Sequence, residues 1–225
     1  MTSQHCGPLA LVGGNEWGEG CSFDADLLAA SGGTDVLVVP TAAAYEHPER
    51  AVESAARWFR TFGGVVTGLG LFSRADASDP AVVAQARQAR FIYLGGGSPL
   101  HLRSVLKQSP VWQAMEEAWR DGAVLAGSSA GAMVLGDPMV DPRGGAFTLG
   151  LGLIEQMAVL PHASSWSPER MQRTVSLTSS GVALLAIDER TAVVRAPDGN
   201  WSVSGVGSAS VFVDGAAAGI DALPG

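Results

Sequence analysis

One serine of the chain lies in a pattern that is typical of a covalent nucleophile. The stretch Gly127-Ser128-Ser129-Ala130-Gly131 fits Gly-x-Ser-x-Gly and lies between the apolar runs AVLA and AMVLG. This order predicts a strand, a sharp turn and a helix, with glycines that let the backbone and the helix approach without Cβ clashes. A hydroxyl at such a turn is exposed and can attack a carbonyl carbon. We therefore expect Ser129 to be the nucleophile and Ser128 to face away from the site.

A serine nucleophile needs a base within hydrogen-bond reach. The chain offers four histidines, which are His5, His47, His101 and His162. His162 follows the apolar run Met157–Leu160 and Pro161, so it falls at the end of an expected strand, near the place where the serine turn should lie. We expect His162 to be the general base.

Two sets of carboxylates could orient the imidazole. The chain order Ser, acid, His, which is that of α/β-hydrolases, would select Asp137, Asp141 or Glu155. The order Ser, His, acid would select Asp188 or Glu189, which end a buried apolar run. The residues by themselves leave both orders open.

Backbone amides near the serine could bind the oxyanion of an acyl-transfer reaction. One donor is usually the amide after the nucleophile, here that of Ala130, and the other comes from a glycine-rich strand end. Gly95-Gly96-Gly97 follows the apolar run Phe91–Leu94. Glycine there would allow the backbone to approach a substrate carbonyl, so we expect this turn to contribute the second donor.

The elements that must position these residues alternate along the first part of the chain. Short apolar runs predict strands that are buried on both faces, at Leu9–Val12, Val36–Val39, Val65–Val66, Phe91–Leu94 and Ala123–Ala126. Amphipathic stretches predict helices at Phe23–Ala30, Pro48–Phe62, Pro80–Arg90, Leu100–Lys107 and Val111–Arg120, with start signals at Asp79-Pro80 and Ser109-Pro110. The alternation predicts an α/β fold with a mostly parallel sheet.

The pattern changes after Gly136. A loop rich in Gly, Pro and Asp precedes a strand-like run at Ile154–Leu160 and a helix that opens at Ser167-Pro168-Glu169. Further strands are expected at Val182–Ile187 and Ala192–Arg195. The turn signal Pro197-Asp198-Gly199-Asn200 predicts that Ala192–Val206 forms a β-hairpin at the margin of the sheet.

Composition limits the class of protein. A length of 225 residues with no linker signal predicts a single domain over 1–225. The N-terminus lacks a secretory signal and no apolar run is long enough to span a bilayer, so we expect a cytoplasmic protein. The net charge of −8 without a Lys/Arg cluster argues against nucleic-acid and membrane partners. Two cysteines without a matching ligand cluster predict no metal site, and nothing in the sequence predicts an oligomeric state.

Four ordered motifs resemble one known family. YLGGGSPLHL, LAGSSAGAMVLG, VLPHASSWSPERMQR and LLAIDERTAVV resemble the serine peptidase family of cyanophycinase and dipeptidase E, over about residues 8 to 206. The opening LVGGNEW is more similar to cyanophycinase. The resemblance implies a three-layer, doubly wound fold, flavodoxin-like or class I glutamine amidotransferase-like, with the nucleophile on a sharp turn.

The resemblance also implies an activity and roles. It implies a peptidase that cleaves small peptides with an acidic residue, either Asp-X or β-aspartyl dipeptides, through an acyl-enzyme and without a cofactor. It assigns the nucleophile, base and acid to Ser129, His162 and Glu189, with Asp137 as a second choice for the acid, and the oxyanion donors to the amides of Gly96 and Ala130. The alternatives are a non-peptide esterase or amidase of α/β-hydrolase type, and a ligand-binding relative without activity.

Substrate-binding residues are less clearly marked. The family commonly carries Asn, Asp or Gln after the glycine turn, where this chain has Gly97-Ser98-Pro99, so Gly97 and Ser98 are candidates for substrate contact. Arg170 and Arg173 lie on one face of an expected helix and could bind a substrate carboxylate. Trp17 and Trp166 could form walls of the pocket, although tryptophans more often pack in the interior.

Overall fold

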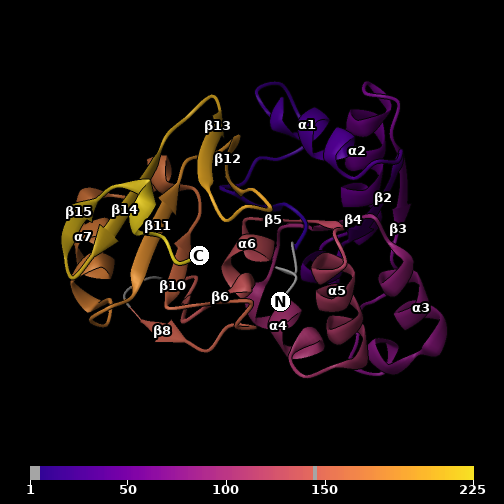
Figure 1. Cartoon of the computed structure of the whole chain (residues 1–225). Coiled ribbons are helices and arrows are strands. Elements are labelled where there is room, and N and C mark those ends of the chain that lie inside the picture. Colours follow the sequence, from indigo (N-terminus) through magenta and orange to yellow (C-terminus); the bar gives the residue numbers. More distant parts are fainter. Residues whose placement is uncertain (1–5, 144–145) are drawn as a thin grey trace, which may run out of the picture.

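The computed structural model describes residues 6–143 and 146–225 and shows a mixed α/β protein with two main sheets (Figure 1). The first sheet contains, in order across it, β13 (Trp201–Gly205), β12 (Thr191–Arg195), β1 (Leu9–Val12), β5 (Val124–Ser128), β4 (Phe91–Leu94), β2 (Asp35–Val39) and β3 (Val65–Gly68). The strands from β1 to β3 in this order are parallel to one another. β12 runs antiparallel to β1, and β13 antiparallel to β12. The expected hairpin at the sheet margin is therefore confirmed.

Helices cover both faces of the first sheet (Figure 1). On one face lie α1 (Phe23–Ala30) and α2 (Pro48–Arg60), and on the other α3 (Pro80–Gln88), α4 (Pro99–Leu106), α5 (Pro110–Arg120) and α6 (Ala130–Leu135). Side chains of a strand alternate between the faces, so Leu9 and Leu11 of β1 pack with α4–α6, whereas Ala10 and Val12 pack with α1 and α2. This explains why the central strands are apolar throughout.

The strand at the edge differs from the prediction. Val65 is 56% exposed and Val66 is only partly buried, so β3 is not buried on both faces as its apolar pair suggested. Among the described strands β3 pairs only with β2, because it forms the end of the sheet. A run of two apolar residues does not reveal which strand will lie at an edge.

The second sheet is a feature that the sequence did not predict as a separate layer. It contains β15 (Ala216–Ala218), β14 (Ala209–Val213), β11 (Ala183–Ile187), β10 (Met157–Leu160), β6 (Gly136–Asp137) and β9 (Ile154–Glu155), in that order. The expected strand Ile154–Leu160 is interrupted at Gln156, which has a φ of +57°. The inner strands β10 and β11 are fully buried and share one core with α6.

Two short strands and one α-helix complete this part of the chain. The short strands β7 (Met139–Val140) and β8 (Phe147–Thr148) pair with each other. The helix α7 (Pro168–Leu177) begins as expected, with the Ser167 hydroxyl accepting from the N–H of Arg170. Asp79 and Ser109 cap α3 and α5 in the same way.

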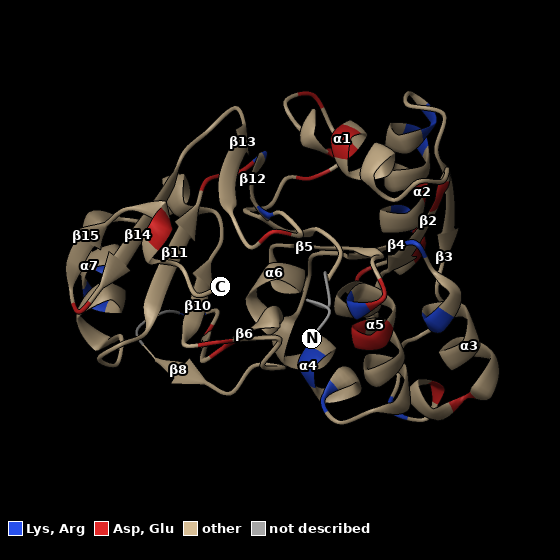
Figure 2. Ribbon diagram, in the orientation of Figure 1, with Lys and Arg blue, Asp and Glu red and all other residues tan. Residues whose placement is uncertain are grey.

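The charges of the molecule are dispersed. In Figure 2 the Lys and Arg segments are scattered among Asp and Glu segments over both parts of the structure. No helix within the described residues combines the length and the apolar character that a bilayer crossing needs.

Candidate active site

Three neighbouring parallel strands end at the same edge of the first sheet. β5 lies between β1 and β4, and all three point the same way, so the segments that follow them meet there. These segments are Gly13–Trp17 after β1, Ser129 after β5 and Gly95–Gly97 after β4. This carboxyl edge is where α/β sheets usually bind ligands.

Ser129 occupies the strained turn that the motif predicts. Its φ of +51° and ψ of −111° place it outside the regions that L-residues normally adopt. A Cβ on Gly127 would come within 2.5 Å of the Gly131 carbonyl oxygen, and a Cβ on Gly131 within 2.2 Å of the Leu94 carbonyl oxygen. Both glycines are therefore required by close backbone approach, which confirms the expected turn.

The three residues assigned to catalysis form one chain of hydrogen bonds. The Oγ atom of Ser129 lies 2.9 Å from Nε2 of His162. The Nδ1 atom of His162 lies 2.8 Å from Oε1 of Glu189. The side chains of His162 and Glu189 are 35% and 37% exposed, so the site is open to solvent on one side. This is the arrangement of a nucleophile, a base and an orienting acid.

His162 and Glu189 each follow a strand of the second sheet. His162 follows β10 and takes a left-handed conformation, with its N–H donating to the carbonyl oxygen of Gly13 at 2.8 Å. Glu189 lies in the short connection from β11 of the second sheet to β12 of the first. The two sheets therefore have to meet at this connection for the three side chains to come together.

The other carboxylates that the sequence left open have different partners. Asp137 accepts from the N–H of Gly150, Asp141 pairs with Arg143, Asp188 accepts from the N–H and hydroxyl of Ser208, and Glu155 is exposed. None of them is hydrogen-bonded to His162. The structure thus favours the order Ser, His, acid, which is not the order of α/β-hydrolases.

Neither His47 nor His101 is hydrogen-bonded to Ser129. His47 pairs with Glu49 on the surface, and His101 packs edge-on against Tyr45 and contacts the carbonyl oxygen of Phe72. His5 lies outside the described residues.

The segment after β1 supplies contacts that sequence reasoning missed. A Cβ on Gly14 would lie 2.2 Å from Cε1 of His162, so the absence of a side chain makes room for the imidazole. Asn15 Nδ2 donates to Glu189 Oε2 at 3.3 Å. Glu16 accepts from the Ser128 hydroxyl at 2.7 Å and from the N–H of Gly96 at 3.3 Å. The available signal was a run of Gly, Asn and Glu directly after a strand, at the edge where the serine turn lies.

The two backbone amides that were expected to bind the oxyanion differ in whether their N–H already has a hydrogen-bond partner. Ala130 is the first residue of α6, where an N–H has no partner within the helix. Gly96 lies against the nucleophile, since a Cβ on it would be 3.4 Å from Ser129 Cβ, but its N–H is directed to Glu16. No hydrogen bond joins the N–H of the exposed Gly97 to another described residue. Within the described residues the N–H groups of Ala130 and Gly97 therefore have no hydrogen-bond partner, whereas that of Gly96 has one.

The candidate substrate residues are only partly available. The Ser98 hydroxyl caps α4 by accepting from the N–H of His101. The guanidinium of Arg170 lies 3.8 Å from the centre of the Trp166 ring and donates to the carbonyl oxygen of Pro142. Arg173 is exposed one turn further along α7. Trp17 packs on Tyr93, with ring centres 5.2 Å apart, beside Gly95.

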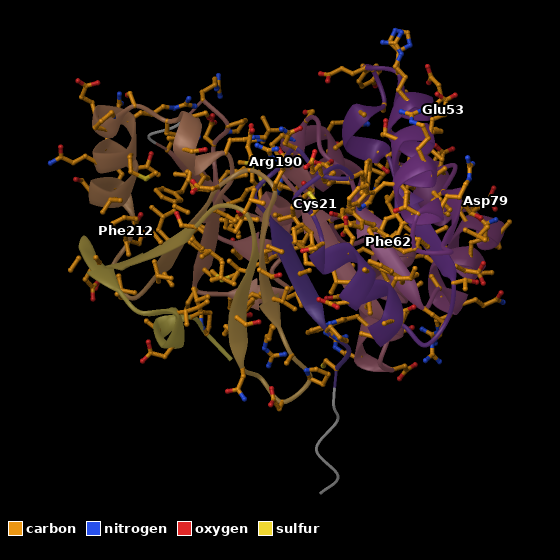
Figure 3. The ribbon with its side chains drawn as sticks, turned by 90° about the horizontal axis from the view of Figure 1, so that it is seen from above. Cys21, Glu53, Phe62, Asp79, Arg190 and Phe212 are labelled. Atoms are coloured by element: carbon orange, nitrogen blue, oxygen red, sulfur yellow. The ribbon has the colours of Figure 1, made fainter. Side chains whose placement is uncertain are left out.

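Buried acidic groups lie behind the segment after β1. Burial raises the pKa of Asp24 to about 8, although a hydrogen bond from the Trp58 indole opposes the shift. Burial also raises the pKa of Cys21 to about 11, so this residue remains a thiol. In Figure 3 Cys21 and Arg190 lie near each other between the two parts of the molecule. Both contact the segment Gly13–Trp17, Cys21 at Asn15 and Arg190 at Gly14.

Within the described residues no three His, Cys, Asp or Glu side chains are grouped as a metal site.

The comparison with family models decides the relationship of this chain. The model of peptidase family S51 matches residues 10–200. The chain belongs to this family. A cyanophycinase of Synechococcus elongatus is 28% identical over 227 aligned positions, which cover 93% of this chain and 70% of the relative. A cyanophycinase of Nostoc sp. (strain PCC 7120) is 32% identical over 155 positions, which cover 64% of this chain and 51% of the relative.

Two solved structures extend the comparison. A crystal structure of a peptidase from an acI-B1 Actinobacterium superposes with a TM-score of 0.84 at 30% identity, and the match covers 94% of this chain and 93% of that one. A putative peptidase E protein from Listeria monocytogenes superposes with a TM-score of 0.67 at 18% identity, covering 90% of this chain and all of that one, which shows a shared fold. As a member of family S51 the protein is a serine hydrolase.

Proposed function

We propose that this protein is a serine peptidase that hydrolyses small peptides containing an acidic residue, either Asp-X or β-aspartyl dipeptides. The observation that carries the proposal is the hydrogen-bonded series from Ser129 through His162 to Glu189, with distances of 2.9 and 2.8 Å. Membership of family S51 and similarity to cyanophycinases support peptide hydrolysis as the reaction. The substrate class is inferred from the family resemblance and from the two arginines on α7, the helix that follows His162 in the chain.

The mechanism uses the three side chains in sequence. Ser129 Oγ attacks the peptide carbonyl carbon while His162 Nε2 accepts its proton, and the ion pair with Glu189 stabilises the imidazolium that forms. The tetrahedral intermediate collapses when the imidazolium returns the proton to the leaving amine. Water, activated by the neutral imidazole, then attacks the acyl-enzyme and releases the acid. These steps require no metal ion or organic cofactor.

The oxyanion needs amides that are free before the substrate binds. The N–H of Ala130 meets this condition on one side of the nucleophile. On the other side Gly96 was expected to be the donor, but its N–H is held by Glu16, so Gly97 is the better candidate within the same turn. We therefore assign the oxyanion hole to the amides of Ala130 and Gly97.

Recognition of a substrate carboxylate is assigned to the arginines of α7. Arg173 is exposed, whereas stacking on Trp166 and the bond to Pro142 already fix the guanidinium of Arg170. A guanidinium that is held in place next to one that is exposed can bind a carboxylate at a defined position. Ser98 caps a helix, which supports a structural role more than substrate contact.

A dipeptide panel tests the proposal. Asp-Ala, Asp-Leu, β-Asp-Arg and β-Asp-Lys would be compared with Ala-Ala, Gly-Leu and a short acyl ester, with amino acid or alcohol release as the readout. We expect cleavage of acidic peptides, and a KM at least about tenfold higher in Arg173→Met for these peptides only, the loss expected for one charge-assisted contact. Cleavage of the ester alone would point to an esterase, and equal cleavage of neutral peptides would remove the acidic preference.

We further propose that the architecture is the doubly wound, class I glutamine amidotransferase-like arrangement and that the protein acts in the cytoplasm. The helices on both faces of the parallel strands support the first point, and so does the serine turn at the carboxyl edge. The parallel strands lie in the order β3-β2-β4-β5-β1, and the part from β3 to β5 follows the flavodoxin-like order 2-1-3-4, which supports the same proposal.

A further inference from the structure

The carboxylate of Glu16 joins two segments whose relative position the proposed reaction requires to be fixed. Its Oε1 accepts from the N–H of Gly96, and its Oε2 accepts from the hydroxyl of Ser128, a side chain that is fully buried at the end of β5. One side chain thus connects the glycine turn after β4 with the strand that carries the nucleophile. No Lys, Arg or His of the described chain forms an ion pair with Glu16.

The bridged glycine lies directly beside the reacting atoms. A Cβ on Gly96 would be 3.5 Å from Glu16 Oε1 and 3.4 Å from Ser129 Cβ. A turn of three successive glycines has wide conformational freedom, whereas an oxyanion donor has to be fixed before the reaction starts. Backbone hydrogen bonds from the N–H of Gly95 to Val39 and from the N–H of Ser98 to Ala42 hold the two ends of this turn, and Glu16 holds the N–H of Gly96 between them.

We propose that Glu16 is a positioning residue that fixes the turn Gly95–Gly97 against the nucleophile, so that the amide following Gly96 points to the developing oxyanion. This inference rests on the proposed function, because it concerns the same acyl transfer. It assigns to Glu16 no contact with substrate. The hydroxyl of Ser128 acts as the second anchor of the bridge, which gives a role to the buried serine next to the nucleophile.

Geometry and charge can be separated at this position. A glutamine at residue 16 can accept from the N–H of Gly96 through its oxygen and donate to Ser128 Oγ through its nitrogen, so it keeps both contacts without the charge. Alanine removes both contacts. A residue that instead recognised a substrate ammonium group would need the charge, and Glu16→Gln would then be as harmful as Glu16→Ala.

The experiment compares kcat and KM of wild type, Glu16→Ala, Glu16→Gln and the control Glu19→Gln, which alters an exposed carboxylate three residues away. For the best dipeptide we expect kcat to fall about 10- to 100-fold in Glu16→Ala with little change in KM, since a misplacement of about 1 Å can reduce turnover by up to about 100-fold. Glu16→Gln should retain kcat within about threefold, since its hydrogen bonds persist. Wild-type kcat in Glu16→Ala would overturn the proposal, as would an equal loss in Glu16→Gln that appears as a raised KM for peptides with a free amine.

A second readout separates this inference from the proposed peptidase activity. The rate at which a fluorophosphonate labels Ser129 also depends on the oxyanion hole and needs no knowledge of the substrate. If wild type is not labelled, the proposed function itself fails. If wild type is labelled and Glu16→Ala is labelled at the same rate, only the positioning role fails.

Ser128→Ala covers the case in which Glu16→Ala does not fold. This variant removes one anchor and leaves Glu16 in place, so we expect a smaller fall in kcat and in labelling rate than for Glu16→Ala. The double variant should be no slower than Glu16→Ala alone, because both changes break the same bridge. Additive losses would contradict the bridge.

Discussion

Gly14 has no side chain at the point where the imidazole of His162 packs against the segment after β1. A methyl group at this position would come within 2.2 Å of His162 Cε1, and the φ of Gly14, +108°, is one that L-residues rarely adopt. Since the base also donates its backbone N–H to Gly13, this glycine pair determines where His162 lies. The catalytic geometry therefore depends on a segment that contributes none of the three catalytic side chains.

Gly14→Ala should displace the imidazole and lower kcat. A misplacement of about 1 Å can reduce turnover on the order of 100-fold, and we expect an effect of this order. Gly18→Ala is the matched control, because no atom lies within 4 Å of a Cβ there and its φ is not positive. Steady-state kinetics on both variants test the point, and wild-type kcat in Gly14→Ala would show that His162 is positioned by other contacts.

Replacing each of two carboxylates by the corresponding amide tests which one orients His162. Glu189→Gln keeps the shape but removes the charge that stabilises the imidazolium, so we expect kcat to fall about 10²- to 10⁴-fold. Asp141→Asn should leave kcat nearly unchanged, because Asp141 pairs with Arg143 and not with the base. A larger loss in Asp141→Asn than in Glu189→Gln would reverse the assignment.

The raised pKa of Asp24 predicts how the free energy of unfolding depends on pH. Its pKa is raised by burial from 3.8 to about 8, so between these values the unfolded chain has lost a proton that the folded chain still binds. Stability should therefore decrease as pH rises through this window and level off above it. Asp24→Asn removes the dependence and can still accept from the Trp58 indole, so near pH 8 it should exceed wild type by on the order of 1 kcal/mol or more.

Urea unfolding of wild type and Asp24→Asn from about pH 4 to about pH 9 measures this difference. Asp26→Asn is the control on the same helix, because Asp26 is exposed and should not change the slope. A difference between wild type and Asp24→Asn that stays constant with pH would mean that Asp24 is ionised in the folded protein throughout the range.

The sequence predicted those parts of the molecule that depend on local pattern. Capping signals predicted that helices begin after Asp79 and Ser109. Apolar runs predicted the central strands, and the spacing of the glycines predicted the serine turn. The residues alone did not choose between Asp137 and Glu189, because the choice depends on β11 and β12 belonging to different sheets. The family motifs made that choice, and the geometry agrees with them.

The features that were missed depend on contacts between distant parts of the chain. Asn15 is 174 residues from its partner Glu189 in the sequence. Glu16 is 80 residues from Gly96 and 112 residues from Ser128. Composition and periodicity carry no information about such pairs. Exposure of β3 was missed for the same reason, since an edge is defined by the absence of a neighbouring strand and not by the strand's own residues.

The most direct test of the central claim is to locate the adduct of a fluorophosphonate by mass spectrometry in wild type, Ser129→Ala and His162→Ala. We expect a single adduct on Ser129 in wild type, no adduct in Ser129→Ala, and labelling of His162→Ala slowed by at least about 100-fold because the base is missing. An adduct on Ser128 or another residue, or equal labelling of Ser129→Ala, would contradict the assignment of Ser129 as the nucleophile of this hydrolase.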